Sequence, residues 1–244
     1  MNPVLLEYSS IVVYTYGFSL CIGSLLATFL VWRRARRLGY STEQIFDMSL
    51  LAGLSALVFA RVFYVLQHWS DFQGSALRMI LVTYFPGLDG IGAVLGIILA
   101  VCAFTFVLKW KPLEIFDSVF YGLGLGIVVI MVGTFFSGGL AGVQTGEPWG
   151  VLYPGLEGVR HPVALYWLGA AVIYALVVFA LDWKLQKNGW ISSAFLLYFG
   201  MLIFALTSLT DFVVNWGAFP MPYYFGLMMV LLGVLLGGLL IRRK

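Results

Sequence analysis

The sequence predicts an all-α membrane protein with seven transmembrane helices and a small outward-facing head domain between the fourth and the fifth helix. Of the 244 residues, 61% are hydrophobic and 10% are charged, whereas a soluble domain usually has about 25% charged residues. The mean hydropathy is +0.98. Apolar runs long enough to cross a hydrocarbon core of about 30 Å occur seven times along the chain. Together these observations exclude a soluble domain.

Each predicted helix corresponds to one apolar run of roughly 20 residues. The runs cover approximately residues 10–32, 49–68, 90–108, 114–134, 163–182, 190–210 and 222–241. The first run is not expected to be a cleaved signal peptide, because Glu7 rather than a basic segment precedes it and a cluster of arginines follows it. No repeat or linker divides the chain, so we expect a single membrane domain, residues 1–244.

Basic residues orient the predicted helices, because most of them follow the odd-numbered runs. Eleven of the fourteen lie there: Arg33, Arg34, Arg36, Arg37, Lys109, Lys111, Lys184, Lys187, Arg242, Arg243 and Lys244. By the positive-inside rule this side is cytoplasmic, which places the N-terminus outside and the C-terminus inside. The net charge of +3 is then explained by membrane anchoring, and we expect no nucleic-acid partner.

The longest outward interval, residues 135–162, is rich in glycine and contains Pro148, Trp149 and Pro154. Non-helical backbone near a membrane must be buried in protein or face water, because unpaired amides in lipid cost several kcal/mol. We therefore expect a small packed head that rests on the helices.

The two cysteines and two histidines do not form a recognisable reactive site. Cys21 and Cys102 both fall inside apolar runs, which favours a packing role over a disulfide. His68 and His161 are far apart, and no Cys-x-x-Cys pattern occurs. We expect no metal site, no catalytic triad and no cofactor other than bound phospholipid.

Several short segments of the chain are informative because of the order in which they occur. Residues 131–142 read Met-Val-Gly-Thr-Phe-Phe-Ser-Gly-Gly-Leu-Ala-Gly, and they precede a Pro148-Trp149 pair and a His161-Pro162 pair. Residues 14–17 (Tyr-Thr-Tyr-Gly) and 59–64 (Phe-Ala-Arg-Val-Phe-Tyr) occur earlier. These segments resemble the prolipoprotein diacylglyceryl transferases, bacterial membrane enzymes that move a diacylglyceryl group from phosphatidylglycerol to a cysteine thiol. The resemblance implies the seven-helix fold and a location in the bacterial plasma (inner) membrane.

The resemblance also implies ionisable or amide side chains at positions where this chain has none. The family's histidine that opens the third helix corresponds to Ile91, and its Arg, Asn and Glu of the signature segment correspond to Met131, Thr134 and Gly139. At four further positions the family has Glu or Arg, and this chain has Trp167, Ile203, Thr207 and Thr210 instead.

The family reaction needs a base for a thiol of pKa about 8.5 and cationic donors for the departing phosphate. Ile, Met, Thr and Gly provide neither. We therefore expect a noncatalytic member that holds phospholipid and packs against a larger membrane assembly. Two alternatives remain: an active transferase with a rewired site, and a small-solute transporter, for which the sequence shows no inverted repeat.

Four residues are candidate contacts for an anionic phospholipid such as phosphatidylglycerol: Arg61, Tyr16, Arg160 and His161. Arg61 lies well inside the second run, where a charge is costly and indicates a functional site. The alternative is that Arg61 has a structural role and binds buried carbonyls or an acidic residue. The alternative for His161 is a hydrogen-bonded residue that ties the head to the helices.

Overall fold

The computed structural model describes residues 1–8, 11–81, 87–181, 188–211, 215–216 and 218–242. The chain divides into two compact units, which are described separately: unit 1 comprises Met1–Arg33 and Asp117–Lys244, and unit 2 comprises Arg34–Phe116. The expectation of one continuous domain stays a prediction. Four basic residues used above to predict the topology lie outside the described residues: Lys184, Lys187, Arg243 and Lys244.

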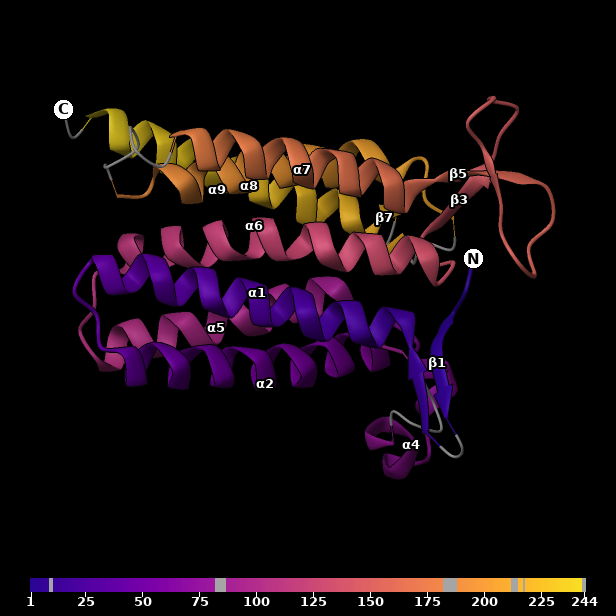
Figure 1. The fold of residues 1–244 in the computed structure, drawn as a ribbon, viewed down its shortest axis with the longest axis horizontal. Helices are drawn as coiled ribbons and strands as arrows, with labels where there is room; N and C mark the ends of the chain where they lie inside the picture. Colours follow the sequence, from indigo (N-terminus) through magenta and orange to yellow (C-terminus); the bar gives the residue numbers. More distant parts are fainter. Residues whose placement is uncertain (9–10, 82–86, 182–187, 212–214, 217, 243–244) are drawn as a thin grey trace. The chain divides into compact units, whose positions relative to one another are not determined.

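Seven helices among the described residues are long and apolar enough to cross a membrane, which confirms the predicted fold class. They are α1 (Thr15–Arg37), α2 (Thr42–Gln67), α5 (Gly90–Val107), α6 (Pro112–Phe136), α7 (Val163–Leu181), α8 (Trp190–Thr207) and α9 (Met221–Arg242) (Figure 1). Two predicted starts are wrong. α2 begins at Thr42 rather than at residue 49, because the polar residues Glu43, Gln44 and Asp47 interrupt the apolar run without interrupting the helix.

The chain before α1 forms strands instead of the predicted start of the first helix. Strand β2 (Ile11–Tyr14) pairs antiparallel with β1 (Val4–Tyr8) in a two-stranded sheet. The β-branched residues of β2 favour an extended backbone, and the strand partner is available only once the chain folds back on itself. α1 therefore begins at Thr15.

In unit 2, α2 packs along α5, and two glycines permit the close approach. A Cβ atom at Gly92 or Gly96 would collide with the α2 backbone at Phe59 or Ser55. Asp89 caps the N-terminus of α5, because its carboxylate accepts a hydrogen bond of 2.7 Å from the Gly92 N–H. Two short helices, α3 (Trp69–Phe72) and α4 (Ala76–Ile80), lie between α2 and α5 in the sequence.

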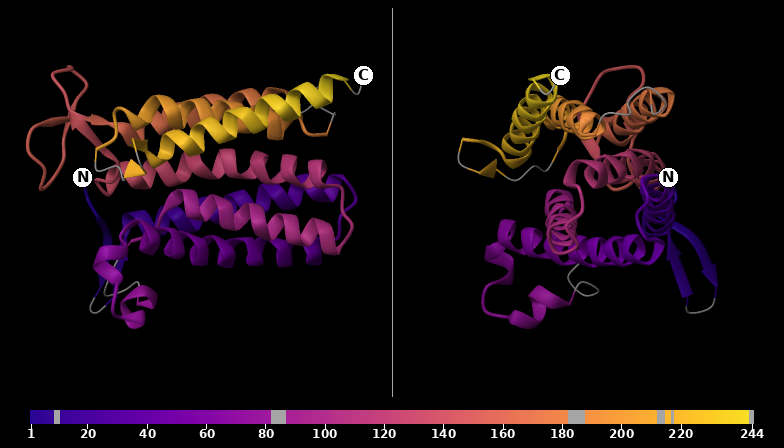
Figure 2. Two further views of the ribbon diagram at one scale, coloured as in Figure 1. Left: turned by 180° about the vertical axis from the view of Figure 1, so that it is seen from behind. Right: turned by 90° about the vertical axis from the view of Figure 1, so that its left-hand side faces the viewer.

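In unit 1, glycines likewise set the helix spacing. A Cβ atom at Gly23 of α1 would lie 2.8 Å from the Gly126 carbonyl oxygen of α6. Gly200 of α8 and Gly226 of α9 face one another, and a Cβ on either would lie 2.9 Å from the carbonyl oxygen of the other. α8 and α9 accordingly run side by side (Figure 2). Small residues at these crossings let van der Waals packing hold the helices together in lipid.

The predicted head, residues 135–162, contains a three-stranded sheet with strand order β3-β5-β4. β3 is Ala141–Gln144, β4 is Val151–Leu152 and β5 is Val159–Pro162. β5 is central: Arg160 is opposite Gln144 of β3 and Val151 of β4. A further two-stranded sheet, β6 (Asn215–Trp216) with β7 (Phe219–Pro220), precedes α9. That the head faces outward stays a prediction.

Candidate functional site

Two of the segments that carry the sequence motifs meet one of the altered family positions, Thr210, in unit 1. Gly142 of β3 forms an isolated β-bridge with Thr210, just beyond the end of α8, and the Val143 N–H donates a 3.0 Å hydrogen bond to the Leu209 carbonyl. Strand β5 lies on the other side of β3. Gly142 has no room for a side chain, because a Cβ there would lie 2.8 Å from the Cβ of His161. We call this cluster, Gly142, Arg160, His161, Leu209 and Thr210, the motif junction.

Arg160 is the buried cation of the motif junction, with 9% of its surface exposed. Its Nη1 donates to the Gly142 carbonyl at 3.1 Å and to the Asp211 carboxylate, and its Nε donates to the Glu157 carbonyl at 3.2 Å. The Asp211 carboxylate offsets the charge of the guanidinium. Sequence reasoning did not single out Asp211, because it lies 51 residues from Arg160 and in no recognisable motif.

His161 is joined to the first turns of α7. Its Nδ1 lies 2.9 Å from the hydroxyl oxygen of Tyr166, and the same oxygen accepts a 2.9 Å hydrogen bond from Nε1–H of Trp149. Strand β5, the loop of the head and α7 are thereby connected through one phenol. This geometry is the arrangement expected for the structural alternative, in which His161 ties the head to the helices. Tyr166, five residues after His161, was not predicted as a site residue.

Tyr153 lies in the same part of the head and is only 3% exposed. Its hydroxyl has no hydrogen-bond partner among the described residues. Burial, and to a smaller extent the neighbouring Tyr166, raises the pKa of the Tyr153 phenol. Tyr153 therefore stays neutral at physiological pH.

The threonines at the altered family positions, two in helices and Thr210 just beyond the end of α8, use their hydroxyls on nearby backbone carbonyls. Thr134, Thr207 and Thr210 each donate to the carbonyl four residues earlier, at 2.8, 2.6 and 2.8 Å. Since a hydroxyl has a single hydrogen to donate, none is left to donate to a ligand in this arrangement.

The remaining altered positions of unit 1 serve packing. The ring of Trp167 is nearly parallel to that of Phe199, at a centroid distance of 6.1 Å. Gly139 closes the end of α6, where its N–H donates to the Thr134 carbonyl at 2.8 Å. Met131 and Ile203 are half-buried on α6 and α8. Ile91 belongs to unit 2, in the first turn of α5.

Arg61 is also in unit 2, buried on α2 with 8% of its surface exposed. Its guanidinium donates to three backbone carbonyls: Met79 at 2.7 Å, Arg78 at 2.8 Å and Gly87 at 3.0 Å. It also lies 5.0 Å from the ring centroid of Phe72. These hydrogen bonds are those of the predicted structural role, in which Arg61 binds buried carbonyls. A contact with a lipid phosphate stays a proposal.

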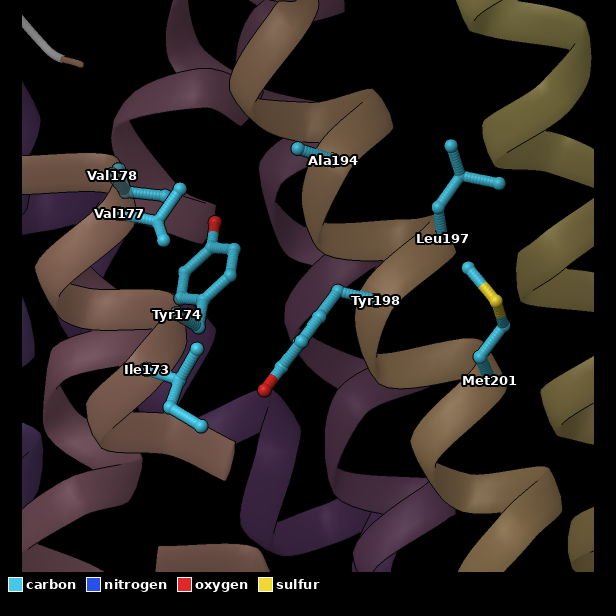
Figure 3. Close-up of a pocket in the computed structure, with 8 residues that line it drawn as sticks. All are labelled: Ile173, Tyr174, Val177, Val178, Ala194, Leu197, Tyr198 and Met201. Carbon is cyan, nitrogen blue, oxygen red and sulfur yellow. The ribbon is translucent and has the colours of Figure 1, made fainter. Parts of the chain in front are cut away.

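Tyr16 and an apolar hollow lie elsewhere in unit 1. Tyr16 is in the first turn of α1 and is 45% exposed. The hollow, about 230 Å³, lies between α7 and α8, and Figure 3 shows Tyr174 and Tyr198 projecting between these helices. Its lining contains none of the predicted site residues: Ile173, Tyr174, Val177, Val178, Ala194, Leu197, Tyr198 and Met201.

Comparison with known proteins identifies the family to which this chain is similar. The family model for prolipoprotein diacylglyceryl transferase matches residues 3–238. The chain is 28% identical over 209 residues to the phosphatidylglycerol–prolipoprotein diacylglyceryl transferase of Chromohalobacter salexigens, covering 84% of this chain and 78% of the relative. The corresponding protein of Legionella pneumophila is 29% identical over 208 residues, covering 81% and 78%. Transferase 2 of Clostridium perfringens is 26% identical over 166 residues, and this match covers 68% of the chain but only 64% of the relative.

Proposed function

Because this chain belongs to the prolipoprotein diacylglyceryl transferase family, we propose that it is a noncatalytic membrane protein that retains the family's fold, binds phospholipid and acts as an accessory subunit of a membrane complex. The family assignment rests on a match over nearly the whole chain. The loss of catalysis, the bound lipid and the accessory role are the proposal.

The proposal that the protein is noncatalytic rests on the side chains at the altered family positions of unit 1. The hydroxyls of Thr134, Thr207 and Thr210 are engaged by backbone carbonyls four residues earlier, and Trp167 is stacked on Phe199. A threonine hydroxyl is in any case a poor base for a thiol. Removing one well-placed charge stabiliser typically lowers a rate about 10²- to 10³-fold, and several are replaced together.

The ionisable groups that are present do not replace the missing ones. Arg160 is paired with Asp211, so a departing phosphate would compete with a carboxylate already in place. Asp117 of α6 is 1% exposed and binds the first turn of α8. Both charged side chains are therefore already engaged within the protein.

Phospholipid is the proposed ligand because the relatives' names specify phosphatidylglycerol as the donor of the transferred group. Arg61, Tyr16, Arg160 and His161 stay the proposed contacts. The accessory role is supported by helix faces that are free to approach a partner closely. Gly53, Gly169 and Gly238 lie on α2, α7 and α9, and a Cβ at each would meet nothing within 4 Å.

The test uses purified protein in phosphatidylglycerol vesicles with a peptide that carries an acceptor cysteine. We expect no transfer of the diacylglyceryl group to the thiol above background. The Legionella pneumophila relative, assayed under the same conditions, is the positive control. Transfer by this chain at a rate near that of the control would refute the noncatalytic proposal.

A second candidate function is an active transferase with a rewired site, and one observation favours it. His161 and Tyr166 form a 2.9 Å hydrogen-bonded pair next to Arg160. A neutral imidazole is a reasonable acceptor for a thiol proton. If the chain does transfer, His161→Gln should abolish transfer while the exposed control Glu157→Gln should not.

A further inference from the structure

The segment that connects α2 and α5 in unit 2 exposes several large apolar side chains. Trp69 of α3 is 52% exposed, and Leu77 and Ile80 of α4 are 68% and 74% exposed. Single exposed apolar residues are common and need no explanation. Three within one short segment, on two consecutive helices, indicate a surface that is covered by something apolar.

The exposure is a fixed feature of the fold, because the other side of the segment is firmly held. Phe72 of α3 is 5% exposed, and its ring packs edge-on against Tyr64 of α2 at 6.1 Å. The carbonyls of Arg78 and Met79 accept hydrogen bonds from Arg61. α3 and α4 are thus attached to α2 through Phe72 and through backbone carbonyls, while Trp69, Leu77 and Ile80 remain exposed.

The position of the segment indicates what covers it. It begins directly after Gln67, the last residue of α2, and ends shortly before α5 begins at Gly90. Both helices are long and apolar enough to cross a membrane. Figure 1 shows α4 beside this end of α2, to the side of the helix. A segment at the end of two membrane spans lies at the depth of the lipid headgroups, where tryptophan is especially favoured.

We propose that Trp69–Ile80 is an interfacial membrane anchor, with Trp69, Leu77 and Ile80 inserted about 5–10 Å into the boundary between headgroups and acyl chains. The partner is a lipid surface. The segment contains one acidic residue, Asp71, and one basic residue, Arg78, so its charge is balanced. Apolar burial rather than attraction to anionic lipid therefore drives the insertion. The inference is independent of whether the protein is catalytic.

The experiment measures the depth of spin labels in the full-length protein reconstituted into phosphatidylcholine vesicles. Leu77→Cys and Ile80→Cys are made in a background where Cys21 and Cys102 are replaced by serine. Leu57→Cys, 53% exposed in the middle of α2, is the hydrocarbon reference, and Glu43→Cys, exposed in the first turn of α2, is the water reference. Power saturation compares collisions with oxygen, which partitions into lipid, and with a water-soluble nickel chelate.

The expected result is an oxygen-to-nickel collision ratio for Leu77 and Ile80 that is shifted from the Glu43 value toward the Leu57 value. Replacing part of the phosphatidylcholine with phosphatidylglycerol should leave the ratio unchanged. Ratios equal to that of Glu43 would place the segment in water and overturn the proposal. Low accessibility to both reagents would mean that protein covers the surface, for example a second copy of the chain, and would overturn it as well.

Discussion

The carboxylate of Asp117 on α6 accepts two hydrogen bonds from Ser192 in the first turn of α8. The Ser192 N–H donates at 2.8 Å and the Ser192 hydroxyl at 2.5 Å. The same carboxylate accepts a third hydrogen bond of 2.7 Å from the N–H of Gly189, the N-cap residue of α8. Asp117 thus acts as the missing cap of a distant helix, whose backbone N–H groups would otherwise lack partners.

Asp117→Asn should destabilise the protein by about 3 kcal/mol, because hydrogen bonds to a charged acceptor are each worth more than neutral ones and an amide N–H2 cannot accept. A lower midpoint of thermal unfolding in mild detergent measures the effect. Asp47→Asn, at an exposed position of α2, is the control and should unfold like wild type. Equal midpoints for the two variants would show that the cap contributes little.

Arg61→Lys should loosen the segment that Arg61 holds. A lysine ammonium is a point charge without the planar fork of donors that reaches the carbonyls of Arg78, Met79 and Gly87 together. Hydrogen–deuterium exchange should become faster in residues 76–81 and 87–89. Arg33→Lys, at an exposed position of α1, should leave that exchange unchanged. Unchanged exchange in Arg61→Lys would show that the hydrogen bonds of Arg61 do not hold this segment.

Lipid retention tests the other proposed role of Arg61. Native mass spectrometry of wild type extracted in mild detergent should show a retained phospholipid. If the guanidinium also contacts the phosphate, Arg61→Ala should lose most of the lipid, whereas Arg61→Lys should keep more of it because the positive charge remains. Equal retention in all three proteins would show that Arg61 is a scaffold residue only.

Gly142→Ala should destabilise the motif junction by about 1–3 kcal/mol, the usual cost of overpacking. The added methyl group would lie 2.5 Å from the Leu209 carbonyl oxygen and 2.8 Å from the His161 Cβ. Gly146→Ala is the matched control in the same head, because its Cβ would meet nothing within 4 Å. Limited proteolysis of the head should be faster in Gly142→Ala than in Gly146→Ala; cleavage at the same rate would argue against the close approach.

Reporter fusions test the predicted topology. Fusions after Arg37, Lys111, Lys187 and Lys244 should be cytoplasmic, and a fusion near Gly146 should be external, since basic residues stay on the cytoplasmic side. An external signal at Lys187 would contradict the predicted order of the spans.

The seven helices could be predicted from the sequence because hydrophobicity is a local property. Each span needs only about 20 consecutive apolar residues, so six of the seven predicted runs begin within five residues of a helix start. The glycine-rich interval 135–162 was also recognisable as a separate, non-helical region. Its sheet was not predicted, because β4 contains two residues, Val151 and Leu152, and such a strand has no periodicity to detect.

By itself, the sequence determined the membrane class, the number of spans and the family resemblance, all of which depend on residue types and their order. Only the tertiary structure decided what the charged side chains bind. Arg160 pairs with a carboxylate 51 residues away, and Asp117 caps a helix that begins more than 70 residues later. Arg61 binds backbone carbonyls, which every residue carries and no sequence pattern marks. A buried charge must find some partner, but folding selects which one.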